Sequence, residues 1–174
     1  MADIIHAYCS TCLIIDSAPF KVCCDEHITM NTYLSISHNA GNPNCKNCIL
    51  QDKSLINIPH KIGTVVKSVG GYWTKSDKIN INNKTLGHLL VDHNREDVVL
   101  NVVPKLPLLL SNYEFADVQN DGKEIHYFIE FDNAAYKIPV KRIRDRWLIP
   151  SIFEITQSTK DRCKTKPRGT LVFP

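Results

Sequence analysis

The sequence contains no run of about 18 apolar residues, the length that a membrane-spanning helix needs. It also has no phosphate-binding loop, no dinucleotide fingerprint and no Gly-x-Ser-x-Gly elbow, so the signatures of the common nucleotide-binding and hydrolytic enzymes are missing. Its first residues combine neither a basic segment nor a long apolar one, so we expect no signal peptide. These absences predict an intracellular protein, cytoplasmic or nuclear, that has no membrane partner.

Positive charge is scarce in the first third of the chain. Residues 1–60 hold three lysines against five acidic residues, whereas residues 61–174 hold eighteen lysines and arginines against thirteen acidic residues. All six arginines lie from Arg95 onward, and five of them from Arg142 onward. The net charge of +3 therefore originates in the C-terminal part of the chain.

Cysteine, by contrast, is concentrated near the N-terminus. Six of the seven cysteines fall within the first 48 residues, together with two histidines that could serve as further ligands: Cys9, Cys12, Cys23, Cys24, His27, His38, Cys45 and Cys48. Thiolates and imidazoles at two-residue spacing are suited to a tetrahedral Zn²⁺ ion, because a tight turn directs both side chains to one point. In a reducing compartment such cysteines favour metal binding over disulfides. The pattern predicts a zinc-binding module over residues 1–58.

Two ligand assignments are compatible with the spacing. In the first, the four ligands of one ion follow the pattern C-x2-C-x11-C-x2-H, and they are Cys9, Cys12, Cys24 and His27. Residues 13–15 and 20–22 would then be the arms of a hairpin, and a helix would begin near Asp25. This order of elements resembles a treble-clef finger. A second ion would use the remaining candidates Cys45 and Cys48, with His38 as the first choice and Cys23 among the others.

In the second assignment a single four-thiolate site uses only the outer pairs, Cys9, Cys12, Cys45 and Cys48. Either arrangement is a closed shell without an open coordination position, so the metal is expected to be structural rather than catalytic. The string from Cys23 through His27 and His38 to Cys45 is similar to the cross-braced zinc domains of nidovirus helicases over about 25 residues. No helicase motif follows, so the resemblance implies no function here.

Residues 59–156 are rich in short β-branched runs separated by turn residues. Strands are expected at 62–68, 97–103, 112–118, 124–132 and 135–140. The sequence Asn120-Asp121-Gly122-Lys123 predicts a tight turn between two of them. Residues 129–143 resemble the paired strands of SH3-like or Tudor-type barrels, and residues 63–73 resemble the first strands of an OB-type barrel. The fold class expected is α+β, mostly β, with a zinc module (treble-clef or cross-braced) followed by a β-barrel or sandwich-like domain.

A basic segment follows these strands. Four cations and one aromatic residue fall within seven positions, namely Lys141, Arg142, Arg144, Arg146 and Trp147. Arginines at phosphates and a tryptophan stacked on a base would bind nucleic acid in a salt-dependent manner. The alternative is a solvated strand end anchored by Ile143 and Trp147. Residues 157–174 are expected to form a basic, poorly ordered tail.

An enzymatic function has weaker support in the sequence. Asp92 and His93, which follow His88, could serve a metal-dependent nuclease, although the same residues make a good loop. Cys163 lies in the basic tail and lacks the surroundings of a nucleophile. The leading hypothesis is therefore a non-enzymatic, zinc-binding regulatory factor that binds RNA or DNA. The alternatives are an adaptor that binds a protein complex through the zinc module, and the nuclease. The richness of the sequence in Lys, Ile and Asn is compatible with a viral origin.

Overall fold

A computed structural model describes residues 14–15, 20–21, 52–82, 85, 88–89 and 93–174 of the chain. The chain divides into two compact units. Unit 1 comprises residues 1–53 and 82–104, and unit 2 comprises residues 54–81 and 105–174. The fold is α+β and rich in sheet, as the sequence predicts.

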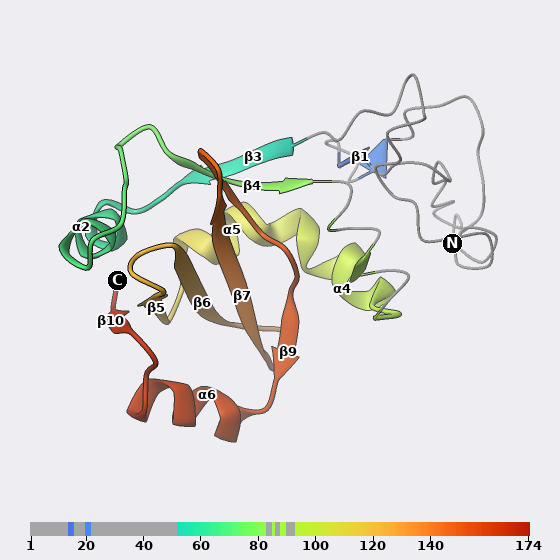
Figure 1. The fold of residues 1–174 in the computed structure, drawn as a ribbon. Coiled ribbons are helices and arrows are strands. Elements are labelled where there is room, and N and C mark those ends of the chain that lie inside the picture. Colours follow the sequence, from blue (N-terminus) through green and yellow to red (C-terminus); the bar gives the residue numbers. More distant parts are fainter. Residues whose placement is uncertain (1–13, 16–19, 22–51, 83–84, 86–87, 90–92) are drawn as a thin grey trace, which may run out of the picture. The chain divides into compact units, whose positions relative to one another are not determined.

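Most of unit 2 is built on a mixed sheet whose strands follow the order β10-β5-β6-β7-β8-β4-β3, with β9 paired to β7 (Figure 1); the first two residues of β3 and the last residue of β4 belong to unit 1. The strands are β3 (Asp52–Asn57), β4 (Lys78–Asn82), β5 (Phe115–Gln119), β6 (Glu124–Phe131), β7 (Ala134–Ile143), β8 (Arg146–Leu148), β9 (Phe153–Ile155) and β10 (Thr170–Val172). Strand β4 runs parallel to β8, and the other pairs with a described register in this sheet are antiparallel. The described residues show no pairing of β10 with β3, so the sheet is open rather than the closed barrel or two-sheet sandwich that we expected.

The antiparallel meander β5-β6-β7 confirms the turn signals of the sequence. Asn120, Asp121 and Gly122 all have positive φ in the first turn, and Asp132 and Asn133 do so in the second. Gly, Asn and Asp tolerate this left-handed backbone better than other residues, because their side chains are absent or short and polar. The register that follows stacks Phe115 on Phe128, with ring centroids 4.4 Å apart.

Two segments that were expected to be strands are helices. Helix α2 (His60–Ser68) replaces the strand over residues 62–68, and helix α4 (Glu96–Asn101), with the 3-10 turn η2 (Val103–Lys105), replaces the strand over residues 97–103. In α2 the fully buried apolar residues Ile62 and Val66 are four positions apart, which is one face of a helix. Burial at helical spacing outweighs the weak β preference of Val and Ile here.

The expectation of a poorly ordered tail is wrong. Residues 157–174 form helix α6 (Gln157–Thr165) and strand β10, which pairs antiparallel with β5. Thr156 caps the helix by accepting a hydrogen bond from the Thr159 backbone N–H. Lys160 is only 2% exposed and donates to the carboxylates of Glu114, at 2.5 Å, and Glu130. Burial acts to lower the pKa of Lys160, but these two carboxylates together raise it.

The core of unit 2 lies along β6, where every residue from Ile125 to Ile129 is buried. Helix α5 (Leu106–Ser111) packs against β6, and α6 packs against β7 (Figure 1). Gly63 allows α2 to approach closely, because a Cβ at this position would lie 2.0 Å from Cε2 of Trp73. The unit thus has the packed interior of an ordinary small domain.

In unit 1 the described elements include α4 and a short hairpin. Strand β1 (Ile14–Ile15) pairs antiparallel with β2 (Phe20–Lys21), in the register Ile14 opposite Lys21 and Ile15 opposite Phe20. This confirms the hairpin arms predicted between Cys12 and Cys23. None of the helices in the part of the chain that the structure describes is long and apolar enough to span a bilayer.

Candidate nucleic-acid interface

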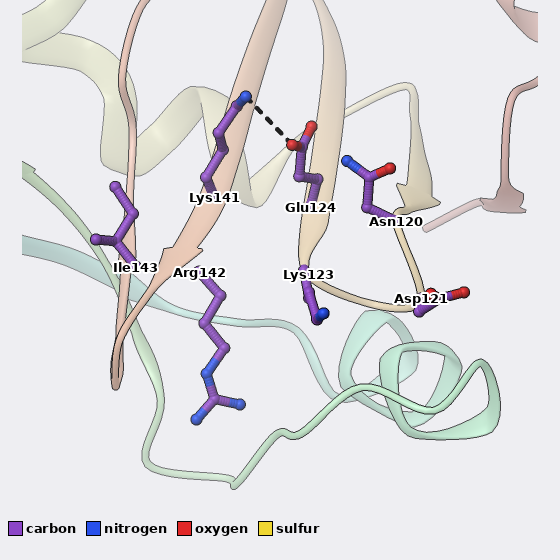
Figure 2. Close-up of a pocket in the computed structure, with 7 residues that line it drawn as sticks. All are labelled: Asn120, Asp121, Lys123, Glu124, Lys141, Arg142 and Ile143. Atoms are coloured by element: carbon purple, nitrogen blue, oxygen red, sulfur yellow. Dashed lines mark ion pairs between the residues drawn. The ribbon is translucent and has the colours of Figure 1, made fainter.

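The predicted basic segment lies where β7 ends and β8 begins. Its four cations are joined by Lys123 of the β5–β6 turn, and we call these five residues the basic surface: Lys123, Lys141, Arg142, Arg144 and Arg146. Figure 2 shows Lys123, Lys141 and Arg142 around a pocket of about 450 Å³ that Asn120, Asp121, Glu124 and Ile143 also line. Lys123, Arg144 and Arg146 are exposed, and Lys141 and Arg142 are partly exposed.

The backbone holds the two parts of this surface together. The Arg142 N–H donates to the carbonyl of Lys123 at 2.9 Å, which continues the β6–β7 ladder into the turn. Arg144 adopts a φ of 59°, in the left-handed region, and this reverses the chain from β7 into β8. A left-handed, exposed arginine in a tight turn has its side chain displayed to solvent, where it can meet an anion.

Two glycines, Gly71 and Gly122, allow the loop after α2 to contact the turn between β5 and β6. The Cα of Gly71 lies so close to Gly122 that a Cβ on Gly122 would approach it to 2.8 Å. The N–H of Gly71 donates to the carbonyl of Val66 at 2.8 Å, which fixes the path of the chain as it leaves α2. Tyr72 follows directly, so its position beside the basic surface depends on this close approach.

Arg142 connects Tyr72 to the basic surface. Its Nη1 donates to the backbone carbonyl of Tyr72 at 2.7 Å, and its guanidinium carbon lies 4.5 Å from the centroid of the Tyr72 ring. Tyr72 remains 61% exposed despite this contact. The arginine therefore covers part of the ring and holds it in place, while most of the ring faces solvent.

Lys141 has a different role from its neighbours. It lies opposite Glu124 in the β6–β7 register, and its Nζ is 3.2 Å from Glu124 Oε1. Burial acts to raise the pKa of Glu124, but the Lys141 ammonium and other hydrogen bonds lower it, so the carboxylate stays ionised. Because Lys141 neutralises Glu124, the cations that can meet an external anion are chiefly Lys123, Arg142 and Arg144.

Trp147 does not offer a ring for stacking. It is 1% exposed, and its Nε1 donates to Oδ2 of Asp77 at 3.2 Å. It lies opposite Arg142 in the β7–β8 register, with the guanidinium carbon 5.9 Å from its ring centroid. Its burial agrees with the alternative interpretation of the sequence, an anchor of the strand in the core, and not with stacking on a base.

Tyr72 and Trp73 are adjacent aromatic residues, and the sequence alone does not tell which of them belongs to a binding surface and which to the core. In the structure they separate: Tyr72 is exposed, while Trp73 is buried against α2. Lys123 was not among the predicted site residues. The signal that could have found it is the turn itself, because a hairpin turn places its residues level with the end of the neighbouring strand.

The predicted zinc ligands Cys9, Cys12, Cys23, Cys24, His27, His38, Cys45 and Cys48 all lie outside the described residues, as does Asp92. Within the described residues no group of three or more His, Cys, Asp or Glu side chains is arranged to hold a metal ion. His88 and His93 do come together, with their Nε2 atoms 2.9 Å apart. Cys163 is a free, partly exposed thiol on α6.

Comparisons with known proteins add no family to this description. A scan against protein-family models, a search of curated proteins and a search of solved structures each gave no match.

Proposed function

We propose that the protein is a non-enzymatic regulatory factor that binds single-stranded RNA or DNA through the basic surface and Tyr72. The observation that carries the proposal is the Arg142 guanidinium lying over a Tyr72 ring that is still mostly exposed. An exposed aromatic ring beside cations is the arrangement that single-strand binders use, because any base can stack on it while the cations meet phosphates.

The chemistry of each residue supports this assignment. A guanidinium has five N–H donors, of which Arg142 uses Nε and Nη1 within the protein, so donors remain for a phosphate oxygen. Lys123 and Arg144 are exposed on neighbouring turns and can meet adjacent phosphates. Base stacking on an aromatic ring contributes about 1–3 kcal/mol, and each phosphate contact adds a salt-dependent term.

We further propose that the N-terminal cysteines bind Zn²⁺ as a structural ion. The β1–β2 hairpin supports this, since it falls between the Cys12 and Cys23 positions where a treble-clef finger has its hairpin. Elemental analysis of the purified protein tests it, with one or two zinc equivalents expected. Protein that is folded and free of zinc would contradict it.

The nucleic-acid proposal is tested by fluorescence anisotropy with a labelled single-stranded oligonucleotide. The triple variant Lys123→Ala, Arg142→Ala, Arg144→Ala should bind at least tenfold more weakly than the wild type. A control that removes exposed cations elsewhere, Arg162→Ala with Lys166→Ala, should lose much less affinity. If the triple variant binds as the wild type does, the basic surface is not the interface.

Tyr72 provides a separate test of stacking. Tyr72→Phe keeps the aromatic ring and should bind nearly as well as the wild type, whereas Tyr72→Ala should lose about tenfold in affinity. Equal affinities of the two variants would remove the ring from the interface. If the wild type binds neither RNA nor DNA but captures a protein, the adaptor function replaces the one proposed.

A further inference from the structure

The pocket beside the basic surface has a polar pair and an apolar side chain that the proposed phosphate contacts do not use. Lys141 and Ile143 are two positions apart on β7 and lie on the same side of this strand, and Glu124 lies opposite Lys141 on β6. Figure 2 shows Lys141 and Glu124 directed toward each other and Arg142 extending away from both. The pocket, with a volume of about 450 Å³ that is ordinary for a small-ligand site, thus adjoins the cations available to phosphates.

Glu124 is an acceptor that its neighbours hold in place. Its Oε1 lies 3.2 Å from Lys141 Nζ and its Oε2 lies 3.2 Å from His126 Nε2, and the Asn120 amide also donates to it. An ionised carboxylate has about four acceptor positions and no donor, so one position remains for a ligand. The Glu124 side chain lines the pocket and is 18% exposed, so a ligand in the pocket can reach it.

Lys141 supplies hydrogen-bond donors beside this acceptor. An ammonium group has three N–H donors, of which one is directed to Glu124, so two remain. Ile143, which is 46% exposed, also lines the pocket and gives the flat face of a ring an apolar surface to cover. Together Glu124 and Lys141 carry no net charge. The pocket is therefore suited to a neutral, planar group with a polar edge rather than to another phosphate.

We propose that the pocket binds one base of the single strand and prefers bases in which an amino group adjoins a ring-nitrogen acceptor, as in cytosine and adenine. The amino group donates to Glu124, while Lys141 donates to the ring nitrogen and, in cytosine, to the neighbouring carbonyl oxygen. In uracil and thymine the ring N–H lies between two carbonyl oxygens, so a hydrogen bond to Glu124 brings one of these oxygens beside the carboxylate. This preference rests on the proposed function, because the base enters the pocket only if the adjacent cations hold the strand.

The test compares oligo(dC) with oligo(dU) of equal length, by fluorescence anisotropy of the full chain at neutral pH. The wild type should bind oligo(dC) roughly fivefold more tightly, since the two strands have the same phosphates and differ only at the base edge. Glu124→Gln should reduce this ratio to within about twofold, because an amide can donate as well as accept. Asp145→Asn is the matched control: it removes an exposed carboxylate from the β7–β8 turn and should leave the ratio unchanged.

An oligonucleotide with pyrimidin-2-one in place of cytosine applies the same test without changing the protein. This base lacks the amino group, so its strand should lose the advantage of oligo(dC) even if Glu124→Gln does not fold. Equal binding of oligo(dC) and oligo(dU) by the wild type would overturn the base preference and leave the basic surface as the interface. A preference that survives in folded Glu124→Gln, or with pyrimidin-2-one, would overturn the role of Glu124. Binding to neither strand would overturn the proposed function and the base pocket with it.

Discussion

Unit 2 and the cysteine-rich N-terminal segment differ in what can hold them together. Unit 2 has a strand buried on both faces, helices packed on the sheet, and most of the positive charge of the chain. The N-terminal 53 residues have six cysteines and an excess of acidic residues, and are too short to bury much apolar surface by themselves. If the N-terminal cysteines bind zinc as proposed above, one region folds by burying a core and the other by binding metal. The contrast also places the proposed nucleic-acid interface in the region that needs no metal.

The largest expected effect comes from removing zinc. A strong chelator should unfold the N-terminal segment, because metal binding supplies apparent free energies of about 10–16 kcal/mol in small zinc modules. Unit 2 should remain folded, since its core is complete without the ion. Backbone amide NMR spectra would show this as a collapse of shift dispersion for residues 1–53 with unchanged shifts in β5, β6 and β7. Simultaneous loss of both sets of signals would contradict the claim that unit 2 folds without zinc.

Gly63→Ala should destabilise unit 2 and leave the N-terminal segment unaffected, which is the reverse of removing zinc. The added methyl group would lie within 2.0 Å of the Trp73 ring, so helix or ring must move, and unit 2 should lose about 3 kcal/mol of unfolding free energy. Zinc content should not change. Thr64→Ala is the matched control, because Thr64 is the exposed neighbour on the same helix. Urea denaturation followed by tryptophan fluorescence measures both variants, and equal midpoints would show that α2 does not depend on this contact.

Lys160→Met tests the attachment of the C-terminal helix. Lys160 is buried and bridges Glu114 and Glu130, so its loss leaves two carboxylates without their shared cation and should cost about 2 kcal/mol. Lys164→Met removes an exposed lysine that forms an ion pair with Glu114, at 3.0 Å, and should cost less than about 1 kcal/mol. Equal losses in thermal or urea unfolding would show that burial of Lys160 contributes nothing specific.

A smaller effect is expected from pH. Burial lowers the pKa of His126, and Lys137 adds to this, while Glu124 and Asp117 act in the opposite direction. Because the pKa is lower in the folded state than the usual value of about 6.5, the unfolded chain binds the proton more tightly. Stability is then fully present above about pH 6.5 and is lost as the pH falls through the folded pKa. His126→Gln should lose less unfolding free energy than the wild type between pH 8 and pH 5, whereas parallel pH profiles would contradict this.

The parts of unit 2 that the sequence predicts well are those with explicit turn signals. The turns at Asp121-Gly122 and Asp132-Asn133 specify the β5-β6-β7 meander, because few residues adopt positive φ readily. The helices α2 and α4 were mistaken for strands since Val and Ile favour strands only weakly, and burial at helical spacing decides. The basic charge of the last eighteen residues led to the wrong prediction of a poorly ordered tail, because highly charged segments are often disordered. In the structure Lys160 binds two carboxylates that lie far away in the sequence, and the segment is ordered.

The residues of the candidate interface also differ in how well the sequence predicts them. The cluster of cations between Lys141 and Arg146 could be read directly from the sequence, because neighbours in a strand and its turn stay neighbours in the fold. The position of Tyr72 beside these cations could not be read from the sequence. It depends on the contact between Gly71 and Gly122, which are fifty-one positions apart. The burial of Trp147 likewise depends on its partners in β4 and β7.

The most direct test of the division between the two regions is the affinity for a single-stranded oligonucleotide measured with and without a chelator. The full chain should bind within about twofold of its zinc-loaded affinity after zinc is removed, whereas the Lys123, Arg142 and Arg144 triple variant should bind at least tenfold more weakly in both conditions. The slope of log affinity against log salt should also become shallower in this variant, by about one for each phosphate that it no longer binds. Binding that disappears with zinc but survives in the triple variant would contradict the account.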